Sequence, residues 1–257
     1  MNSKKIYFAS DLHLGLRAFT KSRERESLFV KWLDAIRTDA AEIFLLGDIF
    51  DYWYEYRRVI PKGFTRFLGK IAEITDSGIP VHFFTGNHDV WMFDYLPKEL
   101  GVSVFRKPIE REFDGKKFFI AHGDGLGPGD VGYKLMKSAF SNSVLQWLYS
   151  RIHPNFTMWL GNTWSNNSRY SKEITHTFKG EEEQITKFAR IELQKNPLDY
   201  FVFGQWHSPI LYPWNQQSRL ILLGDWIVNN TYGVWDGNTF TLCRYGNDGT
   251  SVELDRK

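Results

Sequence analysis

The sequence contains a single cysteine, Cys243, among its 257 residues. An internal disulfide needs two cysteines and a thiolate zinc site needs several, so the sequence excludes both. Neither sign of charge is in excess, because 32 basic and 30 acidic residues give a formal net charge of +2. The chain as a whole is therefore no electrostatic binder of nucleic acid, any basic patch must be local, and we expect no nucleic-acid partner.

Long apolar runs are also missing. The first one, residues 6–9, is too short for a signal peptide, and no later run could span a bilayer. We therefore expect a protein of the cytoplasm or of its membrane face. The chain has no internal repeat, low-complexity stretch or flexible linker, and its hydrophobic share of 42% is ample for a core. These features predict a single α/β domain, residues 1–257, with an insertion.

Polar clusters follow several apolar runs of the chain at the point where each run ends. The runs near residues 5–9, 42–46, 81–84, 117–121 and 200–203 are typical of buried strands. Ligands bind at the carboxyl ends of strands in open α/β sheets, so we expect the polar side chains after these strands to converge. These side chains, all oxygen or imidazole donors, are Asp11, His13, Asp48, Asn87, His88, His122 and His207.

The converging donors predict a site for divalent metal ions. Oxygen and nitrogen donors without sulfur suit Mn²⁺, Fe or Zn in a hydrolytic site. Segments that meet at one edge could hold two ions roughly 3.5–4 Å apart, and we expect Asp48 to bridge them. Asp51 is predicted to orient a neighbouring histidine. His82, His153 and His176 are expected to pack or to lie on the surface.

Two further segments are rich in aromatic side chains. From about residue 130 to about 197 the pattern is helical and carries more apolar residues than a plain surface insertion needs. It predicts a helical lid over the site, a dimer face, or an element that touches lipid, and these alternatives leave the oligomeric state open. Residues 51–58 mix aromatic rings with cations, and they form either an edge loop over the core or the wall of a pocket.

Five motifs in fixed order carry a resemblance to a known family. Asp-x-His, Gly-Asp-x-x-Asp, Gly-Asn-His-Asp, His-Gly-Asp and Gly-x-x-His closely resemble the motifs of the calcineurin-like metallophosphoesterases. Within them, the chain is most similar to the UDP-2,3-diacylglucosamine diphosphatases of lipid A synthesis. That similarity rests on residues 10–15, 47–53 and 122–125, with Asp130 and Tyr133 beyond, and on the aromatic helical insertion. It implies a β-sandwich flanked by helices, with a helical lid at about residues 130–197.

The resemblance also implies an activity. These enzymes are Mn²⁺-dependent hydrolases that cleave UDP-2,3-diacylglucosamine, a lipidated nucleotide sugar, to UMP and 2,3-diacylglucosamine 1-phosphate. An enzyme for this substrate would lie peripherally on the cytoplasmic face of the inner membrane. Two alternatives stay open: a metallophosphoesterase for another phosphoester such as a nucleotide, and a weakly active or inactive paralogue.

The resemblance assigns residues by position. One ion would be held by Asp11, His13, Asp48 and His207, and the other by Asp48, Asn87 and His122, with Gln205 at a further ligand position. His88, oriented by Asp89, would steady the developing charge or protonate the leaving oxygen. The candidate contacts to the substrate's head group are Asn87, His88, Asp130, Ser165, Ser168, Arg169 and Lys172.

The chain departs from the family pattern at two positions. His88 stands where the lipid A enzymes carry arginine, although histidine is the choice of the wider superfamily. Gln205 stands where the superfamily has a histidine ligand of the second ion. Because a neutral amide oxygen is a weaker donor than imidazole, we expect the second ion to bind less tightly.

Overall fold

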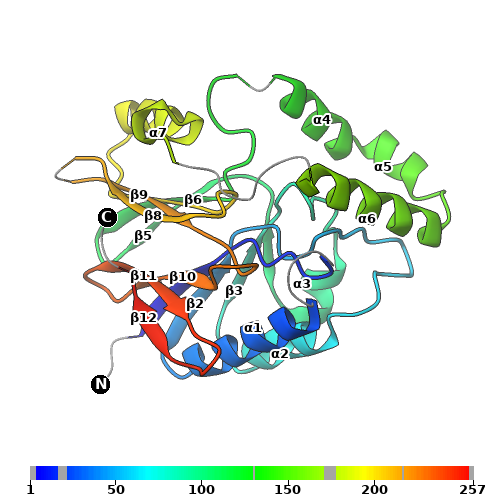
Figure 1. The fold of residues 1–257 in the computed structure, drawn as a ribbon, viewed down its shortest axis with the longest axis horizontal. Coiled ribbons are helices and arrows are strands. Elements are labelled where there is room, and N and C mark those ends of the chain that lie inside the picture. The colour runs from blue at the N-terminus through cyan, green and yellow to red at the C-terminus, as the bar shows by residue number, and fades with distance from the viewer. Residues whose placement is uncertain (1–3, 17–21, 130, 171–177, 216, 255–257) are drawn as a thin grey trace.

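A computed structural model describes residues 4–16, 22–129, 131–170, 178–215 and 217–254. Two β-sheets lie against each other in the centre of this structure, with helices outside them (Figure 1). The larger sheet has the order β12 (Ser251–Glu253), β11 (Phe240–Tyr245), β10 (Thr231–Trp235), β1 (Lys5–Ala9), β2 (Ala40–Leu45), β3 (Val81–Phe84) and β4 (Ser103–Phe105). The smaller sheet has the order β5 (Ile109–Phe113), β6 (Lys116–Ala121), β7 (Tyr200–Phe203), β9 (Arg219–Leu223) and β8 (Pro209–Pro213).

The strands that lead to the polar clusters are parallel within each sheet. β1, β2, β3 and β4 pair in parallel, and so do β6, β7 and β9. Their carboxyl ends therefore share one edge of each sheet, where the loops of the two sheets meet. The amide of Gln205, after β7, donates to Asp11 Oδ2, after β1, at 2.9 Å. This contact brings the polar ends of both sheets to one place.

The period-two alternation of the strands separates the core into layers. On β1, Ile6 and Phe8 face the second sheet, where Phe8 stacks on Phe118 at 6.3 Å between ring centroids. Tyr7 and Ala9 face the other way, toward α1 (Ser22–Ile36) and α2 (Thr65–Asp76). The small helix α3 (Tyr95–Leu100) contributes to the same layer. The hydrophobic side chains of this layer are removed from water, which stabilises each by about 1.5–3 kcal/mol.

The outer face of the second sheet is covered by α7 (Gln184–Lys195), which follows the short 3₁₀ helix η1 (Gly180–Glu182). Ile185 and Ala189 of α7 pack on Phe119 of β6 and Phe201 of β7. The order of layers is therefore helix, sheet, sheet, helix (Figure 1). This arrangement confirms the predicted β-sandwich flanked by helices.

Three helices between β6 and α7 project beyond the sheets (Figure 1). They are α4 (Val131–Ser141), α5 (Ser143–Tyr149) and α6 (Pro154–Tyr170), and we call them the insertion helices. The side chain of Asn142 caps α5 by accepting from two backbone N–H groups, and Pro154 occupies the first turn of α6. They lie where the sequence predicts the insertion; that residues 1–257 form one domain stays a prediction. Within the described ranges, no helix is long and apolar enough to cross a membrane.

Candidate metal centre

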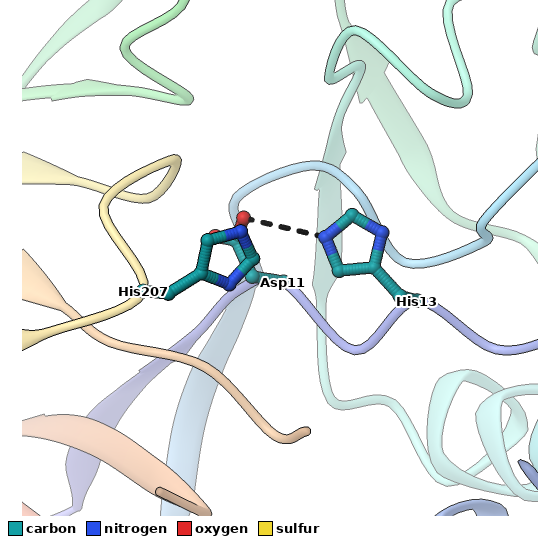
Figure 2. Close-up of side chains that lie close together, drawn as sticks. All are labelled: Asp11, His13 and His207. Atoms are coloured by element: carbon teal, nitrogen blue, oxygen red, sulfur yellow. Dashed lines mark ion pairs between the residues drawn. The ribbon is translucent and has the colours of Figure 1, made fainter. Parts of the chain in front are cut away.

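Histidine nitrogens from the ends of β1 and β6 lie beside the carboxylate of Asp48, which follows β2. Asp48 Oδ2 lies 3.6 Å from His13 Nε2 and 3.6 Å from His122 Nε2. His13 Nε2 also lies 3.7 Å from Asp11 Oδ1, the contact that Figure 2 shows beside the ring of His207. These separations exceed hydrogen-bond length but suit two ligands that share an ion at about 2.1 Å each. The predicted central place of Asp48 agrees with this geometry.

The donor atoms fall into overlapping groups. Within the described residues, the atoms of each group lie within 4.8 Å of one another. Asp48 belongs to one group and His13 to two, so neighbouring groups share members. The three groups are Asp11, His13 and His207; Asp11, Asp48 and His122; and His13, Asp51 and His88.

Four residues of the centre adopt a left-handed backbone that side chains other than glycine rarely adopt. The φ angles are 56° at Asp11, 44° at His13, 51° at Asp48 and 64° at Gln205. Each such residue costs about 1–3 kcal/mol, and such strain gathers at functional sites. The fold therefore maintains an unfavourable backbone where the donors meet.

Two glycines let the backbone reach these carboxylates closely. A Cβ at Gly86 would lie 2.2 Å from Asp48 Oδ1, and one at Gly204 would lie 2.0 Å from Ser10 Oγ and 2.9 Å from Asp11 Oδ2. No side chain fits at such distances. The glycines of Gly-Asn-His-Asp and of Gly-x-x-His are thus required by close packing around the donors.

The fit of the donor set to a divalent cation follows from its buried atoms that have no hydrogen-bond partner. Among the described residues, the candidate ligands with such an atom include Asp11 (Oδ1), Asn87 (Oδ1), His122 (Nε2) and Gln205 (Oε1). Unpaired buried polar atoms cost about 1–3 kcal/mol each and are rare. A carboxylate oxygen, two amide oxygens and an imidazole nitrogen are donors that divalent metals accept, so the residues fit such ions.

Two buried carboxylates lie behind the histidines of the centre. Asp51 Oδ1 is 3.4 Å from His13 Nδ1, and Asp225 Oδ2 is 3.2 Å from His207 Nδ1. A carboxylate at Nδ1 leaves Nε2 for the ligand position. Burial alone would raise the pKa of Asp225, but hydrogen bonds from His207 and from the backbone N–H groups of residues 228 and 229 lower it. Sequence reasoning missed Asp225, whose signal is a Gly-Asp pair directly after β9.

Asp89 has a different role from the one predicted. Its fully buried carboxylate accepts hydrogen bonds from four backbone N–H groups, at 2.7 Å from Gly86, 3.3 Å from Asp48, 2.8 Å from Ile49 and 3.2 Å from Phe50. In contrast, His88 Nδ1 lies 3.0 Å from the Asp51 carbonyl oxygen and 3.9 Å from Asp51 Oδ1. The carboxylate beside the His88 ring is therefore that of Asp51, and Asp89 joins the two loops. The catalytic role of His88 stays a prediction.

Buried negative charge dominates the electrostatics. Burial, and then the charge of Asp48, raise the pKa of Asp89 to about 7, and burial raises the pKa of Asp11. Burial alone would lower the pKa of His122, but the charges of Asp48, Asp11 and Asp124 outweigh it and raise that pKa to about 9. Gathering carboxylates in a buried place is costly, and bound cations offset that cost.

The structure describes the remaining predicted site residues only in part. Asn87 lies in the β3 loop between Gly86 and His88. Asp130 and Lys172 lie outside the described residues, and Ser165, Ser168 and Arg169 are described only as backbone of α6. Their substrate contacts stay predictions, as do all the ligand assignments.

Of the histidines expected away from the site, two are described. His82 Nε2 lies 2.8 Å from Glu42 Oε2, and its ring packs on Phe44 at 4.5 Å between centroids. His153 is exposed next to the first residue of α6, whereas His176 lies outside the described residues. The prediction that these two histidines pack or lie on the surface therefore agrees with the structure.

The fold and the five strand-end motifs define a known class of protein. The calcineurin-like phosphoesterase family model matches residues 4–209, and the chain belongs to that family. It is 42% identical over 252 residues to the UDP-2,3-diacylglucosamine hydrolase of Porphyromonas gingivalis, covering 93% of this chain and 96% of that protein. The UDP-2,3-diacylglucosamine hydrolase of Vibrio atlanticus is 24% identical over 253 residues, with 93% and 96% covered.

A solved structure is similar over most of the chain. The phosphoesterase Yfce from E. coli aligns with 97% of this chain and 98% of its own, at 14% identity and a TM-score of 0.47.

Proposed function

We propose that this chain hydrolyses the pyrophosphate of UDP-2,3-diacylglucosamine, giving UMP and 2,3-diacylglucosamine 1-phosphate. Membership of the family makes the chain a phosphoesterase. The proposed substrate comes from the similarity of the chain to two UDP-2,3-diacylglucosamine hydrolases. The observation that carries the proposal is the cluster of donors around Asp48, within a chain that aligns over 93% of its length with a hydrolase at 42% identity.

We further propose that the centre holds two divalent metal ions and that these ions are Mn²⁺. Asp11, His13, Asp48 and His207 would hold one ion; Asp48, Asn87, His122 and Gln205 would hold the other. The absence of sulfur among the donors and the unpaired atoms of Asn87 and Gln205 support this assignment. When bound, such ions polarise phosphoryl oxygens and supply hydroxide near neutral pH.

The protein's own groups orient the reaction. Water adds to one phosphorus of the pyrophosphate, the bridging P–O bond breaks, and the leaving phosphate oxygen takes up a proton. The ring of His88, whose side chain is 16% exposed, meets the ring of His13 edge-on at 4.9 Å. It is thus placed beside the donors, where it can hold a phosphoryl oxygen or protonate the leaving oxygen.

Release of UMP tests this proposal. The purified chain is expected to release UMP from UDP-2,3-diacylglucosamine only with added Mn²⁺, and Asp48→Ala is expected to abolish the release. Asp248→Ala, in an exposed turn before β12, is the matched control and should keep parental activity. No release at any metal concentration would overturn the proposal, and faster cleavage of an unacylated nucleotide substrate would favour the alternative phosphoesterase.

We also propose a peripheral position on the cytoplasmic face of the inner membrane. The exposed apolar side chains of the insertion helices support it, because exposed aromatic and aliphatic side chains on helices favour contact with lipid. Trp147 is 55% exposed and Trp159 is 59% exposed. The larger set is Val131, Leu135, Val144, Leu145, Trp147, Leu148, Phe156, Trp159 and Leu160 of these helices, with Ile152 between α5 and α6.

Sedimentation with vesicles tests the membrane proposal. Trp147→Glu and Trp159→Glu are expected to reduce binding to vesicles of anionic phospholipid. Val252→Glu, at a 61% exposed position on β12, should leave the binding unchanged. If the tryptophan variants change the oligomeric state in solution and leave vesicle binding unchanged, the exposed surface is a dimer face and the membrane proposal is wrong.

A further inference from the structure

Three tyrosines from one loop reach the insertion helices. Tyr52 Oη lies 2.7 Å from Tyr149 Oη of α5, and Tyr54 Oη donates to the carbonyl oxygen of Gln146 at 2.8 Å. Tyr56 Oη is hydrogen-bonded to Thr157 Oγ1 of α6. The three hydroxyls thus contact two helices that lie about a hundred residues further along the chain. We call Tyr52, Tyr54 and Tyr56 the tyrosine anchor.

Ring packing reinforces these hydrogen bonds. Tyr149 stacks on Trp91 at 5.7 Å between centroids and an angle of 14°, and it packs against Tyr54 at 4.9 Å. A Cβ at Gly161 would lie 2.3 Å from a ring carbon of Tyr52, so α6 lies directly on that ring. Aromatic pairs of this kind add to the stability that comes from burial alone.

The anchor attaches α5 and α6 to the loop that follows β2. None of their described residues belongs to the three hydrophobic clusters of the core, and α5 has no buried residue. The side chain of Thr157, which is fully buried, is a partner of the anchor itself. Without such contacts, a helix as short as α5 is only marginally stable in water.

The anchor follows directly on a residue of the metal centre. Asp51 Oδ1 lies 3.4 Å from His13 Nδ1, and the Asp51 carbonyl oxygen lies 3.0 Å from His88 Nδ1. Tyr52 is the next residue. At the other end of the insertion, Asp124, two residues after His122, is hydrogen-bonded to Tyr133 and Lys137 of α4. These two attachments of the insertion helices therefore start next to residues of the centre.

Burial keeps the hydroxyls of the anchor in the form that donates hydrogen bonds. It raises the pKa of Tyr54 to about 12, and it is also the main cause of the raised pKa of Tyr52. Both groups are thus protonated at any pH at which the protein works.

We infer that Tyr52, Tyr54 and Tyr56 are positioning residues that hold α5 and α6 in a fixed place relative to the metal centre. This inference rests on the proposed function, because the fixed helices preorganise the surface that receives the acylated half of the substrate. Preorganisation lowers the entropy cost of binding, so its loss weakens substrate binding without removing any group that reacts. The three tyrosines therefore act through the helices that they hold, and not on the scissile bond.

Steady-state kinetics test the inference. Tyr52→Phe and Tyr54→Phe are each expected to raise KM for UDP-2,3-diacylglucosamine about fivefold, the loss of one hydrogen bond, with kcat changed less than about twofold. Tyr149→Phe removes the partner of the Tyr52 hydroxyl from the other side and is also expected to raise KM. Tyr7→Phe is the matched control, because its hydroxyl donates to Asp39 at 2.8 Å, away from the insertion.

Amide hydrogen exchange supplies a readout that needs no activity. Tyr54→Phe is expected to speed exchange in residues 143–161, and Tyr7→Phe is not. Unchanged KM together with unchanged exchange would overturn the inference. A lowered melting temperature with parental KM would also overturn it, because that result is the sign of a merely structural role. If the parental chain releases no UMP, the proposed function is wrong, and exchange alone still decides whether the anchor holds the helices.

Discussion

Replacing Asp89 by Asn tests whether one buried carboxylate holds the Asp48 loop and the Gly86 loop together. Oδ1 accepts from the amides of Gly86 and Asp48, and Oδ2 accepts from those of Ile49 and Phe50. An amide side chain keeps one oxygen, and its NH₂ group would face two N–H donors in either orientation. Two hydrogen bonds are therefore lost, and two buried N–H groups stay unpaired.

The expected loss follows from these bonds. Each unpaired buried donor costs about 1–3 kcal/mol, which gives about 2–6 kcal/mol for two of them. The pKa of Asp89, raised to about 7 chiefly by burial, shows that the carboxylate is itself costly to bury, so we expect the lower part of that range. A loss of about 2–3 kcal/mol corresponds to a melting temperature lower by about 4–12 °C in a protein of this size.

Two measurements check this prediction. Urea unfolding compares Asp89→Asn with the parental chain, and calorimetric titration with Mn²⁺ compares their metal binding. Asp248→Asn is the control, because its exposed carboxylate caps a turn by accepting from Thr250. If Asp89→Asn unfolds at the parental urea concentration and binds Mn²⁺ with parental affinity, Asp89 does not hold the two loops together.

Three further predictions concern single positions. Gly86→Ala is expected to weaken Mn²⁺ binding about tenfold or more, since its Cβ would overlap the Asp48 carboxylate, whereas Gly69→Ala, with nothing within 4 Å, should stabilise α2 by about 0.5–1 kcal/mol. The hydrogen bond from His82 lowers the pKa of Glu42 in the folded protein. The stabilising effect of this hydrogen bond is therefore complete above the unfolded-state pKa of 4.5 and is lost as the pH falls through the lower folded-state pKa. Glu42→Gln should therefore cost up to about 1 kcal/mol in urea unfolding at pH 7 and progressively less as the pH falls below 4.5, and a cost that does not change with pH would contradict this. Gln205→His is expected to tighten binding of the second ion in a Mn²⁺ titration; UMP release that occurs only in this variant would identify the parental chain as an inactive paralogue.

The convergence of the donors was predictable because strand order and strand ends leave a clear pattern. Asp11, Asp48 and His122 each follow an apolar run, and parallel pairing brings the carboxyl ends of such runs to one edge. The predicted meeting of these residues agrees with the structure, where they form one group. The helical character of residues 131–170 was likewise visible in the pattern.

Contacts between residues that lie far apart in the sequence were not predictable in this way. The sequence places Asp89 next to His88, yet the carboxylate turns to amides about forty residues earlier in the chain. Asp225 gives no signal beyond its place after a strand, because its function depends on the distance to His207. The aromatic loop at residues 51–58 left two alternatives, since only the folded chain shows that Tyr54 reaches α5.

The strain and the buried charge of the centre oppose folding at the same place. Four left-handed residues at about 1–3 kcal/mol each are comparable with the whole stability of a typical domain, about 5–15 kcal/mol. The hydrophobic layer between the two sheets offsets this cost, and nothing in that layer requires a left-handed Asp11 or Asp48. Two carboxylates and His13 aimed at one point are favourable only when positive charge lies between them. We therefore infer that the backbone of the centre is maintained by its function as a cation site, at the expense of folding stability.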